Sequence, residues 1–238
     1  MSDRLTLACI DSEAPPLFNA SPDGVRRTGY EPEAAALVAG EIGREVDWLI
    51  TSWTEMIPKV QAGEADAVWC GQGITAERQA HVDFTTPYAI FDETVLVRKD
   101  DPARGPGDLA GYRVAAIANS TNMALAETFP GIIPVPFGAS DDVFADMLDA
   151  LRKGTVDAVV DDDVVTVPLG ADPDFAIAFT EPTGNRWGVG VAKGNSELLQ
   201  QLNTALETVI ADGRLEAIWT KWMPDLAFPL NQPQKERK

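Results

Sequence analysis

Residues 63–88 read GEADAVWCGQGITAERQAHVDFTTPY, and this stretch predicts how the chain is built. The apolar run Ala67-Val68-Trp69 is typical of a short buried strand in a parallel sheet. It leads into Gly71-Gln72-Gly73, where two residues lack a Cβ and backbone amides can come close to a ligand. Arg78 follows five residues after that turn, and its planar guanidinium can bind a carboxylate or phosphate through paired hydrogen bonds. The stretch therefore predicts an anion-binding site at the end of a strand.

The chain contains this unit twice. Residues 53–68 (WTEMIPKVQAGEADAV) align without a gap on residues 144–159 (FADMLDALRKGTVDAV) at a constant offset of 91. The aligned pairs include Trp53–Phe144, Met56–Met147, Gly63–Gly154 and Asp66–Asp157. In each copy apolar residues recur on one helical face, and glycine then ends the helix before a strand. Any α/β protein contains helix–glycine–strand units, but the unbroken register favours two similar lobes.

Length and charge restrict the class of protein. A chain of 238 residues can form one large α/β domain or two lobes of about 100 residues each. The net charge of −18 argues against nucleic acid or an anionic membrane surface as a partner. No run approaches the 18 or so consecutive apolar residues of a membrane-spanning helix.

The sequence offers little support for metal, cofactor or triad chemistry. His81 is the single histidine, so a histidine-based metal site and a Ser-His-Asp triad are poorly supported. Cys9 and Cys70 both lie in apolar runs and are predicted to be free, buried thiols. We therefore expect no metal and no cofactor.

The stretch around Arg78 resembles the amino-acid class of bacterial extracellular solute-binding proteins, family 3. The matching residues of the family pattern, in order, are Thr75, Arg78, Asp83, Phe84, Pro87 and Tyr88. The resemblance covers about Leu5 to Pro224. It implies a periplasmic-binding-protein-like α/β fold, with two α/β lobes, a two-crossing hinge and a ligand cleft between the lobes. Lobe I is then residues 1–94 and 186–238, and lobe II is residues 95–185, with crossings near residues 92–98 and 184–190.

The resemblance also implies which residues hold the two charged ends of an amino acid. Arg78 takes the carboxylate, helped by the turn residues Cys70, Gly71 and Gly73 and by the helix start at Asn119, Ser120 and Thr121. Asn119 replaces the usual glycine, and asparagine tolerates the left-handed backbone conformation better than most residues. Asp162 takes the ammonium, and strand alternation predicts that Asp161 faces the other way.

The side-chain end of the ligand is expected near the exit of the first strand. Asp11 is the predicted first contact and Glu13 the second, and Phe18 belongs to the loop that opens this side of the cleft. Trp53 is interpreted equally well as a stacking platform for the ligand or as a core residue beside a helix cap. Two acids at this place favour a polar or cationic ligand.

The function that the resemblance implies is capture of an amino acid or related zwitterion for ABC-type import. The partner is then a membrane permease, and the chain is expected to be a monomer in the periplasm or at the cell surface. No signal peptide precedes Leu5, so the alternatives are a removed leader or a cytoplasmic protein.

Two other functions compete with transport. The chain also resembles cyclohexadienyl dehydratases, whose catalytic glutamate lies shortly after the Asp-like strand end. Val164, Val165 and Thr166 stand in that region here, and a general acid needs a proton donor. The third possibility is a ligand-sensing module of a larger receptor.

Overall fold

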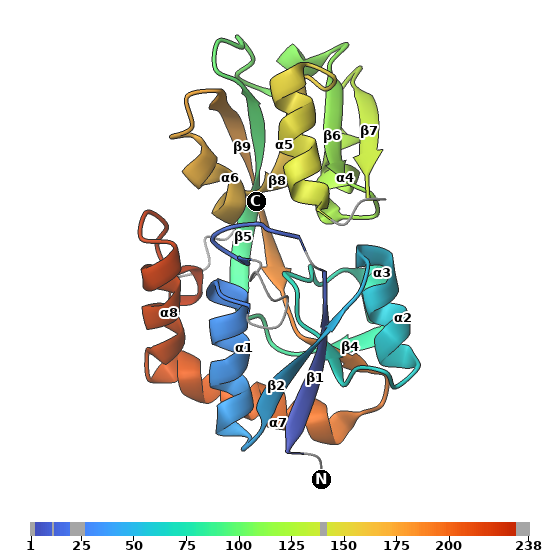
Figure 1. Cartoon of the computed structure of the whole chain (residues 1–238), viewed down its shortest axis with the longest axis vertical. Helices are drawn as coiled ribbons and strands as arrows, with labels where there is room; N and C mark the ends of the chain where they lie inside the picture. Colours follow the sequence, from blue (N-terminus) through green and yellow to red (C-terminus); the bar gives the residue numbers. More distant parts are fainter. Residues whose placement is uncertain (1–2, 11, 20–26, 139–141, 232–238) are drawn as a thin grey trace.

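The computed structural model describes residues 3–10, 12–19, 27–138 and 142–231. The chain forms two α/β lobes stacked along its long axis, and the first strand, β1 (Arg4–Cys9), and the last α-helix, α8 (Arg214–Trp222), lie in the same lobe (Figure 1). Within the described residues each lobe is built on one five-stranded sheet. The predicted α/β fold with two lobes is therefore confirmed.

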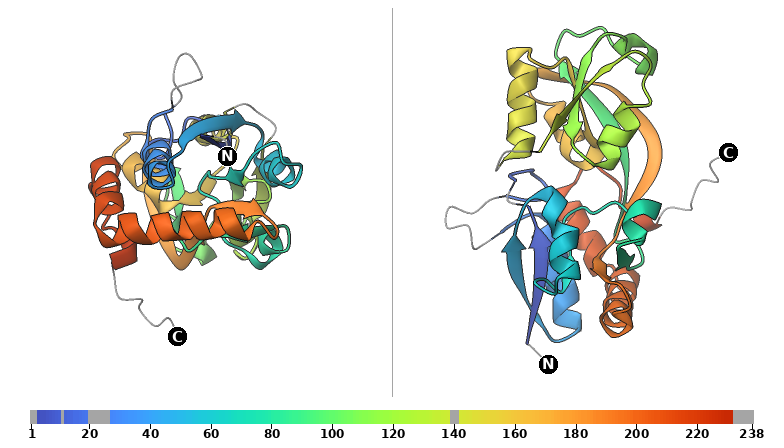
Figure 2. Two further views of the ribbon diagram at one scale, coloured as in Figure 1. Left: turned by 90° about the horizontal axis from the view of Figure 1, so that it is seen from below. Right: turned by 90° about the vertical axis from the view of Figure 1, so that its right-hand side faces the viewer.

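The first lobe has the strand order β2-β1-β3-β10-β4. Its strands are β1 (Arg4–Cys9), β2 (Glu45–Ile50), β3 (Ala67–Val68), β4 (Val82–Phe84) and β10 (Gly190–Ala192). β1 runs parallel to β2 and β3, whereas β10 is antiparallel to β3 and β4. Its helices are α1 (Tyr30–Glu41), α2 (Met56–Gln61), α3 (Ala76–Gln79), α7 (Ser196–Ala211) and α8 (Arg214–Trp222). The elements β10, α7 and α8 of this lobe thus come from the end part of the chain (Figure 2).

The second lobe has the strand order β7-β6-β8-β5-β9. Its strands are β5 (Ala89–Arg98), β6 (Arg113–Ile117), β7 (Ile133–Phe137), β8 (Ala158–Asp162) and β9 (Phe175–Trp187). Its helices are α4 (Thr121–Ala126), α5 (Val143–Lys153) and α6 (Asp163–Leu169). Three short 3-10 helices complete the described elements: η1 (Trp53–Glu55), η2 (Pro106–Leu109) and η3 (Pro229–Asn231).

The antiparallel strands β5 and β9 connect the two lobes (Figures 1 and 2). At the first lobe Phe91 pairs with Asn185, and in the second lobe Glu93 pairs with Glu181. The register shifts between these two pairs, so the ladder is interrupted at the waist of the molecule. Both chain crossings therefore lie in one strand pair, and the boundaries at residues 94 and 186 stay a prediction.

The repeat at offset 91 has the same local structure in both lobes. Gly63 and Gly154 follow their helices with φ angles of 74° and 70°, a left-handed conformation that glycine adopts without strain. The first copy has the shorter regular helix, since α2 begins only at Met56 and contains Pro58 in its first turn. Proline is tolerated there because the first amides of a helix have no partner within it.

An aspartate after each glycine fixes the strand that follows. Asp66 donates its backbone N–H to the Thr6 carbonyl, and its carboxylate accepts the Thr6 N–H, both at 2.8 Å. Asp157 makes the same pair of bonds with Arg113, at 2.8 and 3.0 Å. Each aspartate therefore aligns the strand that follows it, β3 or β8, with its parallel neighbour, β1 or β6, and this explains why the repeat includes it.

Replacing Asp157 by asparagine is expected to lower the free energy of unfolding by about 1–3 kcal/mol at pH 7. The Asp157 carboxylate bonds the guanidinium groups of Arg113 (2.9 Å) and Arg98 (3.2 Å), and these contacts hold its pKa well below the usual range. A lowered folded-state pKa stabilises the protein above the unfolded pKa of about 4 and ceases to do so as the pH falls through the folded value.

Urea unfolding of the wild type and the variant between pH 2.5 and 8 measures this difference. The difference in free energy of unfolding between the wild type and Asp157→Asn should be constant above pH 5 and become smaller at lower pH. Asp149→Asn, which removes one exposed partner of Lys153, is the control and should cost less than 0.5 kcal/mol or so. A pH-independent gap would show that the ion pairs do not stabilise the lobe.

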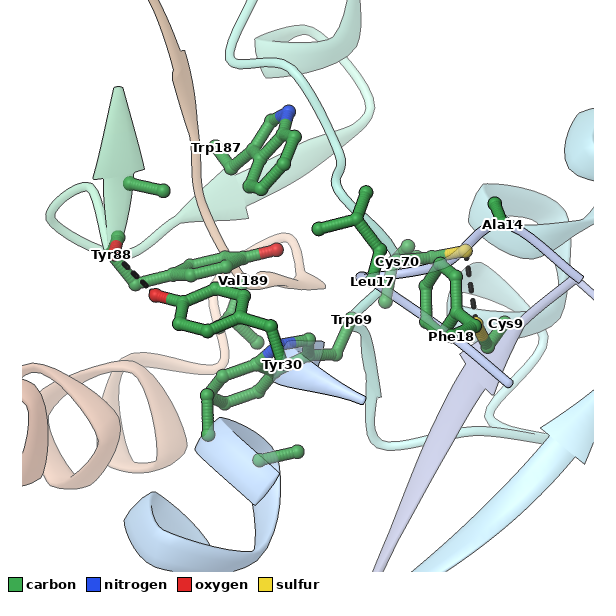
Figure 3. Close-up of a cluster of buried hydrophobic side chains, with 14 of the residues drawn as sticks. Cys9, Ala14, Leu17, Phe18, Tyr30, Trp69, Cys70, Tyr88, Trp187 and Val189 are labelled. Carbon is green, nitrogen blue, oxygen red and sulfur yellow. Dashed lines mark hydrogen bonds between the residues drawn. The ribbon is translucent and has the colours of Figure 1, made fainter. Parts of the chain in front are cut away.

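A cluster of aromatic side chains forms the core of the first lobe next to the waist (Figure 3). Trp69 and Tyr88 pack with ring centroids 5.0 Å apart, and Tyr88 lies 6.1 Å from Trp187. Tyr30 donates its hydroxyl to the Tyr88 carbonyl at 3.1 Å and packs edge-on against Trp219 at 5.3 Å. The end of β3 and the end of β9 are thereby held in one rigid core.

Candidate ligand-binding site

A cavity of about 60 Å³ lies between the lobes and is lined by both of them. The first lobe contributes Ile10, Ser12, Ala14, Leu17, Phe18, Trp53, Cys70, Gly71, Gly73 and Arg78. The second lobe contributes Ile117, Ser120, Thr121, Asn122, Phe144, Asp161, Asp162 and Val165. The carboxyl ends of the parallel strands β1, β3, β6 and β8 all lead into this cavity, as expected for ligand sites in open α/β sheets.

Arg78 is held in place from its own lobe. It lies in the short helix α3, where the Thr75 hydroxyl caps the helix by accepting the Arg78 N–H at 3.2 Å. Its Nη1 donates to the Gly73 carbonyl at 2.9 Å. With the Gln72 amide oriented so that its oxygen faces the arginine, that oxygen accepts from Nε and Nη1, both at 2.9 Å. Three of its five N–H donors are thereby engaged within its own lobe.

Arg78 also reaches the second lobe and an aromatic ring. Its Nη2 donates to the Asn119 carbonyl at 3.0 Å, and its guanidinium lies 5.4 Å from the Trp53 ring centroid. Burial lowers the pKa of Arg78, while the nearby Glu77 and Asp162 carboxylates oppose this effect. The guanidinium keeps its charge, since arginine stays protonated in proteins. Trp53 thus stacks on the arginine at the cavity wall.

Asn119 and Ser120 shape the second lobe's side. Asn119 has φ of 60°, so it takes the left-handed conformation in place of the usual glycine, and its side chain does not line the cavity. The Ser120 hydroxyl accepts the Met123 N–H at 3.0 Å and donates to the Ile117 carbonyl at 2.6 Å. Ser120 therefore caps α4, and the next residue, Thr121, also faces the cavity.

The lobes are closed on each other in this structure. The Ser12 hydroxyl donates to the Asp142 carboxylate at 2.9 Å, across the cleft. A Cβ placed on Gly73 would lie 3.2 Å from the Thr121 methyl group and 3.1 Å from Arg78 Nη1. These contacts are tighter than ordinary van der Waals contact, so a Cβ at this place would require Arg78 and Thr121 to shift by a few tenths of an ångström.

Asp161 and Asp162 place two neighbouring carboxyl groups at the end of β8, in the second lobe. Asp161 and Asp162 are both buried, and Asp161 accepts hydrogen bonds from the Asp162 backbone N–H (2.8 Å) and the Asn122 amide (3.3 Å). Asp162 Oδ1 is buried without a hydrogen-bond partner in the described part of the protein. This oxygen is the free acceptor that a ligand ammonium needs.

The surroundings of Asp161 and Asp162 raise the pKa of both carboxyl groups. Burial, together with Glu93, raises the pKa of Asp161 to about 7. Burial, then Asp161 and Glu93, raise the pKa of Asp162. Glu93 is the direct neighbour of Asp162 on the adjacent strand β5. A cation bound between these groups would relieve their mutual repulsion.

Several predicted site residues line the cavity and two do not. Those at the cavity are Phe18, Trp53, Cys70, Gly71, Gly73, Arg78, Ser120, Thr121 and Asp162. Glu13 is exposed and does not line the cavity, and Asn119 meets Arg78 only through its backbone. Asp11 lies outside the described residues. The expected orientation of Asp161 was wrong, because its carboxylate folds back onto the Asp162 N–H and also lines the cavity.

Phe144 and Asp161 line the cavity but were not predicted as site residues, although the repeat contains a signal for them. Phe144 aligns with Trp53 at offset 91, and both rings line the cavity from opposite lobes. The same offset relates Cys70 to Asp161 and Gly71 to Asp162. Corresponding positions of the two lobes therefore line the same cavity. Ser12 and Asn122 carry no comparable signal.

A family model for bacterial extracellular solute-binding proteins, family 3, matches residues 6–225. The chain belongs to this family. An ABC transporter arginine-binding protein 1 of Escherichia coli is 29% identical over 203 residues, 82% of each chain. The L-cystine-binding protein TcyJ of Escherichia coli is 29% identical over 222 residues, 91% of this chain and 81% of the relative. The chain is thus a solute-binding protein of the type that serves amino-acid ABC transporters.

Solved structures agree with this assignment. An ancestral arginine-binding protein bound to arginine has a TM-score of 0.84 and 30% identity, over 93% of this chain and 99% of that one. An ancestral amino acid-binding protein described as a precursor of cyclohexadienyl dehydratase has a TM-score of 0.83 and 27% identity, over 93% and 96%. Within the described residues, no helix is long and apolar enough to cross a membrane. In the same residues no group of three or more His, Cys, Asp or Glu side chains could hold a metal.

Proposed function

We propose that this solute-binding protein captures an amino acid with a cationic or polar side chain, L-arginine first, and delivers it to a membrane permease. The observation that carries the proposal is the pair of opposed charges across the closed cleft. Arg78 takes the ligand carboxylate from the first lobe, and Asp162 takes the ammonium from the second. Because each lobe holds one end, the bound ligand favours the closed state.

The charge of the cavity supports a cationic side chain. Arg78 supplies one positive charge, whereas Asp161 and Asp162 supply two negative charges when both are ionised. A zwitterion with one further positive charge neutralises that set, and a neutral or acidic amino acid does not. Trp53, Phe18 and Phe144 add aromatic surfaces on which a guanidinium can stack.

Asp161 and Asp162 thus take the place of Asp11 and Glu13, the acids first expected to contact the ligand side chain. Glu13 points to solvent, so we assign it no role in recognition. The role of Asp11 stays a prediction. The relative named for arginine supports a cationic ligand, and the relative named for cystine supports a polar one. A monomer working in the periplasm completes the proposal.

A dehydratase function is the rival, since one structural neighbour is described as a precursor of such an enzyme. The cavity wall after β8 is formed by Val165, while Val164 and Thr166 are buried. The Thr166 hydroxyl donates to the Asp162 carbonyl at 2.9 Å and is thereby engaged in its own helix. A general acid at these positions is missing, so we propose binding without turnover.

A calorimetric series with arginine, lysine, histidine, glutamine, glutamate and leucine tests the proposed ligand class. Arginine should bind tightest, by about tenfold or more over leucine, because one charge-assisted hydrogen bond contributes roughly 1.5–3 kcal/mol. Tightest binding of leucine or glutamate would refute the cationic class while leaving the role of Arg78 open. Incubation with a cyclohexadiene carboxylate should yield no dehydrated product.

A further inference from the structure

Cys9 and Cys70 lie side by side (Figure 3), and Cys70 lines the ligand cavity. Cys9 is the last residue of β1, and Cys70 lies two residues after β3, the parallel neighbour of β1. Their Sγ atoms are 2.9 Å apart, although the two residues are 61 positions apart in the chain. Both are free thiols, and both are almost completely buried. The fold thus places two thiols in direct contact.

The two thiols differ in their access to solvent. Cys70 lines the cavity between the lobes, so a small molecule can reach its sulfur when the lobes are apart. Cys9 does not line the cavity, and burial raises the pKa of its thiol well above the usual range. Cys70 is therefore the thiol that reacts first, and Cys9 is the one that resolves the product.

We propose that Cys9 and Cys70 form a disulfide through exchange with a small disulfide such as oxidised glutathione. The Cys70 thiolate attacks one glutathione sulfur, forms a mixed disulfide and releases one glutathione thiolate. The Cys9 thiolate then attacks the Cys70 sulfur and releases the second glutathione. The two protein thiols lose two protons and two electrons, and one oxidised glutathione becomes two reduced glutathiones.

The positions of Cys9 and Cys70 predict that the disulfide would stabilise the protein. A disulfide would join the exit of β1 to the turn that carries Gly71 and Gly73. It closes a loop that contains α1, β2 and α2, so it should raise the thermal midpoint by about 5 °C or more. An oxidising compartment such as the periplasm favours its formation.

Intact-mass measurement of the full chain tests the proposal. The reduced protein is incubated with oxidised glutathione, then denatured and treated with N-ethylmaleimide. The wild type should end as a monomer about 2 Da lighter than the reduced chain, with no maleimide added. Cys9→Ser should stop at one glutathione adduct, and Cys70→Ser should stay unmodified. Two alkylatable thiols, a lasting adduct on the wild type or a disulfide-linked dimer would each overturn the proposal.

A second arm uses L-arginine and rests on the proposed function. Saturating arginine should slow oxidation of the wild type severalfold, because the closed lobes cover Cys70. An unchanged oxidation rate, in a protein that calorimetry shows to bind arginine, would overturn access through the cavity. If calorimetry shows no arginine binding, the ligand proposal fails while the mass measurement still decides the disulfide.

Discussion

Replacing Arg78 by lysine should weaken arginine binding by about 30-fold to 3,000-fold and leave the fold intact. The guanidinium bonds Gly73 and Asn119 and lines the cavity where the ligand carboxylate is proposed to bind. A lysine ammonium is a point charge that cannot make these bonds at the same time. Loss of one partner from a buried, hydrogen-bonded charge pair costs roughly 2–5 kcal/mol, and each 1.4 kcal/mol is tenfold in affinity.

Titration calorimetry measures the loss, and urea unfolding shows whether the fold is kept. Arg44→Lys is the matched control, since Arg44 follows α1 outside the cavity and should leave the affinity unchanged. The bond from Arg78 to Asn119 also joins the lobes, so the lysine variant should close less readily in solution scattering. Equal affinity of wild type and Arg78→Lys would remove Arg78 from the ligand site.

The second large effect is expected from Asp162→Asn. The asparagine keeps the shape of the side chain but removes the charge that balances the ligand ammonium, so arginine affinity should fall by about 30-fold or more. Because burial and neighbouring acids raise the pKa of Asp162, its ionised form costs folding free energy. The ligand-free variant should therefore be as stable as the wild type at pH 8, or more stable, which separates lost binding from misfolding.

The same pKa shifts predict how binding depends on pH. The free protein keeps a proton on this pair of acids up to about pH 7, the pKa of Asp161, whereas an ammonium ligand requires the ionised form. Binding therefore releases a proton, and arginine affinity should fall up to about tenfold for each pH unit below 7.

Calorimetry between pH 5.5 and 8.5, in two buffers of different ionisation enthalpy, measures both the affinity and the proton release. Asp162→Asn should flatten the pH profile. Asp174→Asn, at an exposed carboxylate of the second lobe, should reproduce the wild-type profile. Wild-type affinity that stays constant from pH 8 to pH 5.5 would contradict ammonium binding at this pair.

Local structure could be predicted from the sequence because short stretches encode it. Leu198, Leu202 and Leu206 recur every fourth residue in the sequence and are all buried on one face of α7. Gly63 and Gly154 mark helix ends because a left-handed residue is needed there. Arg78 could be found from the sequence because a strand end, a glycine turn and a helix cap, all within about fifteen residues, mark its position.

Which residues come together at the cavity was decided only by the tertiary structure. Phe144, Cys9 and Asp161 meet residues far away in the chain, and no local spacing states which lobe surface will face which. Glu13 follows a strand end as the motif requires, yet its loop directs it to solvent. The physical reason is the range of the interactions. A helix or turn forms from neighbours within about four residues, whereas the cleft forms between two lobes whose relative position depends on the strand pair β5 and β9.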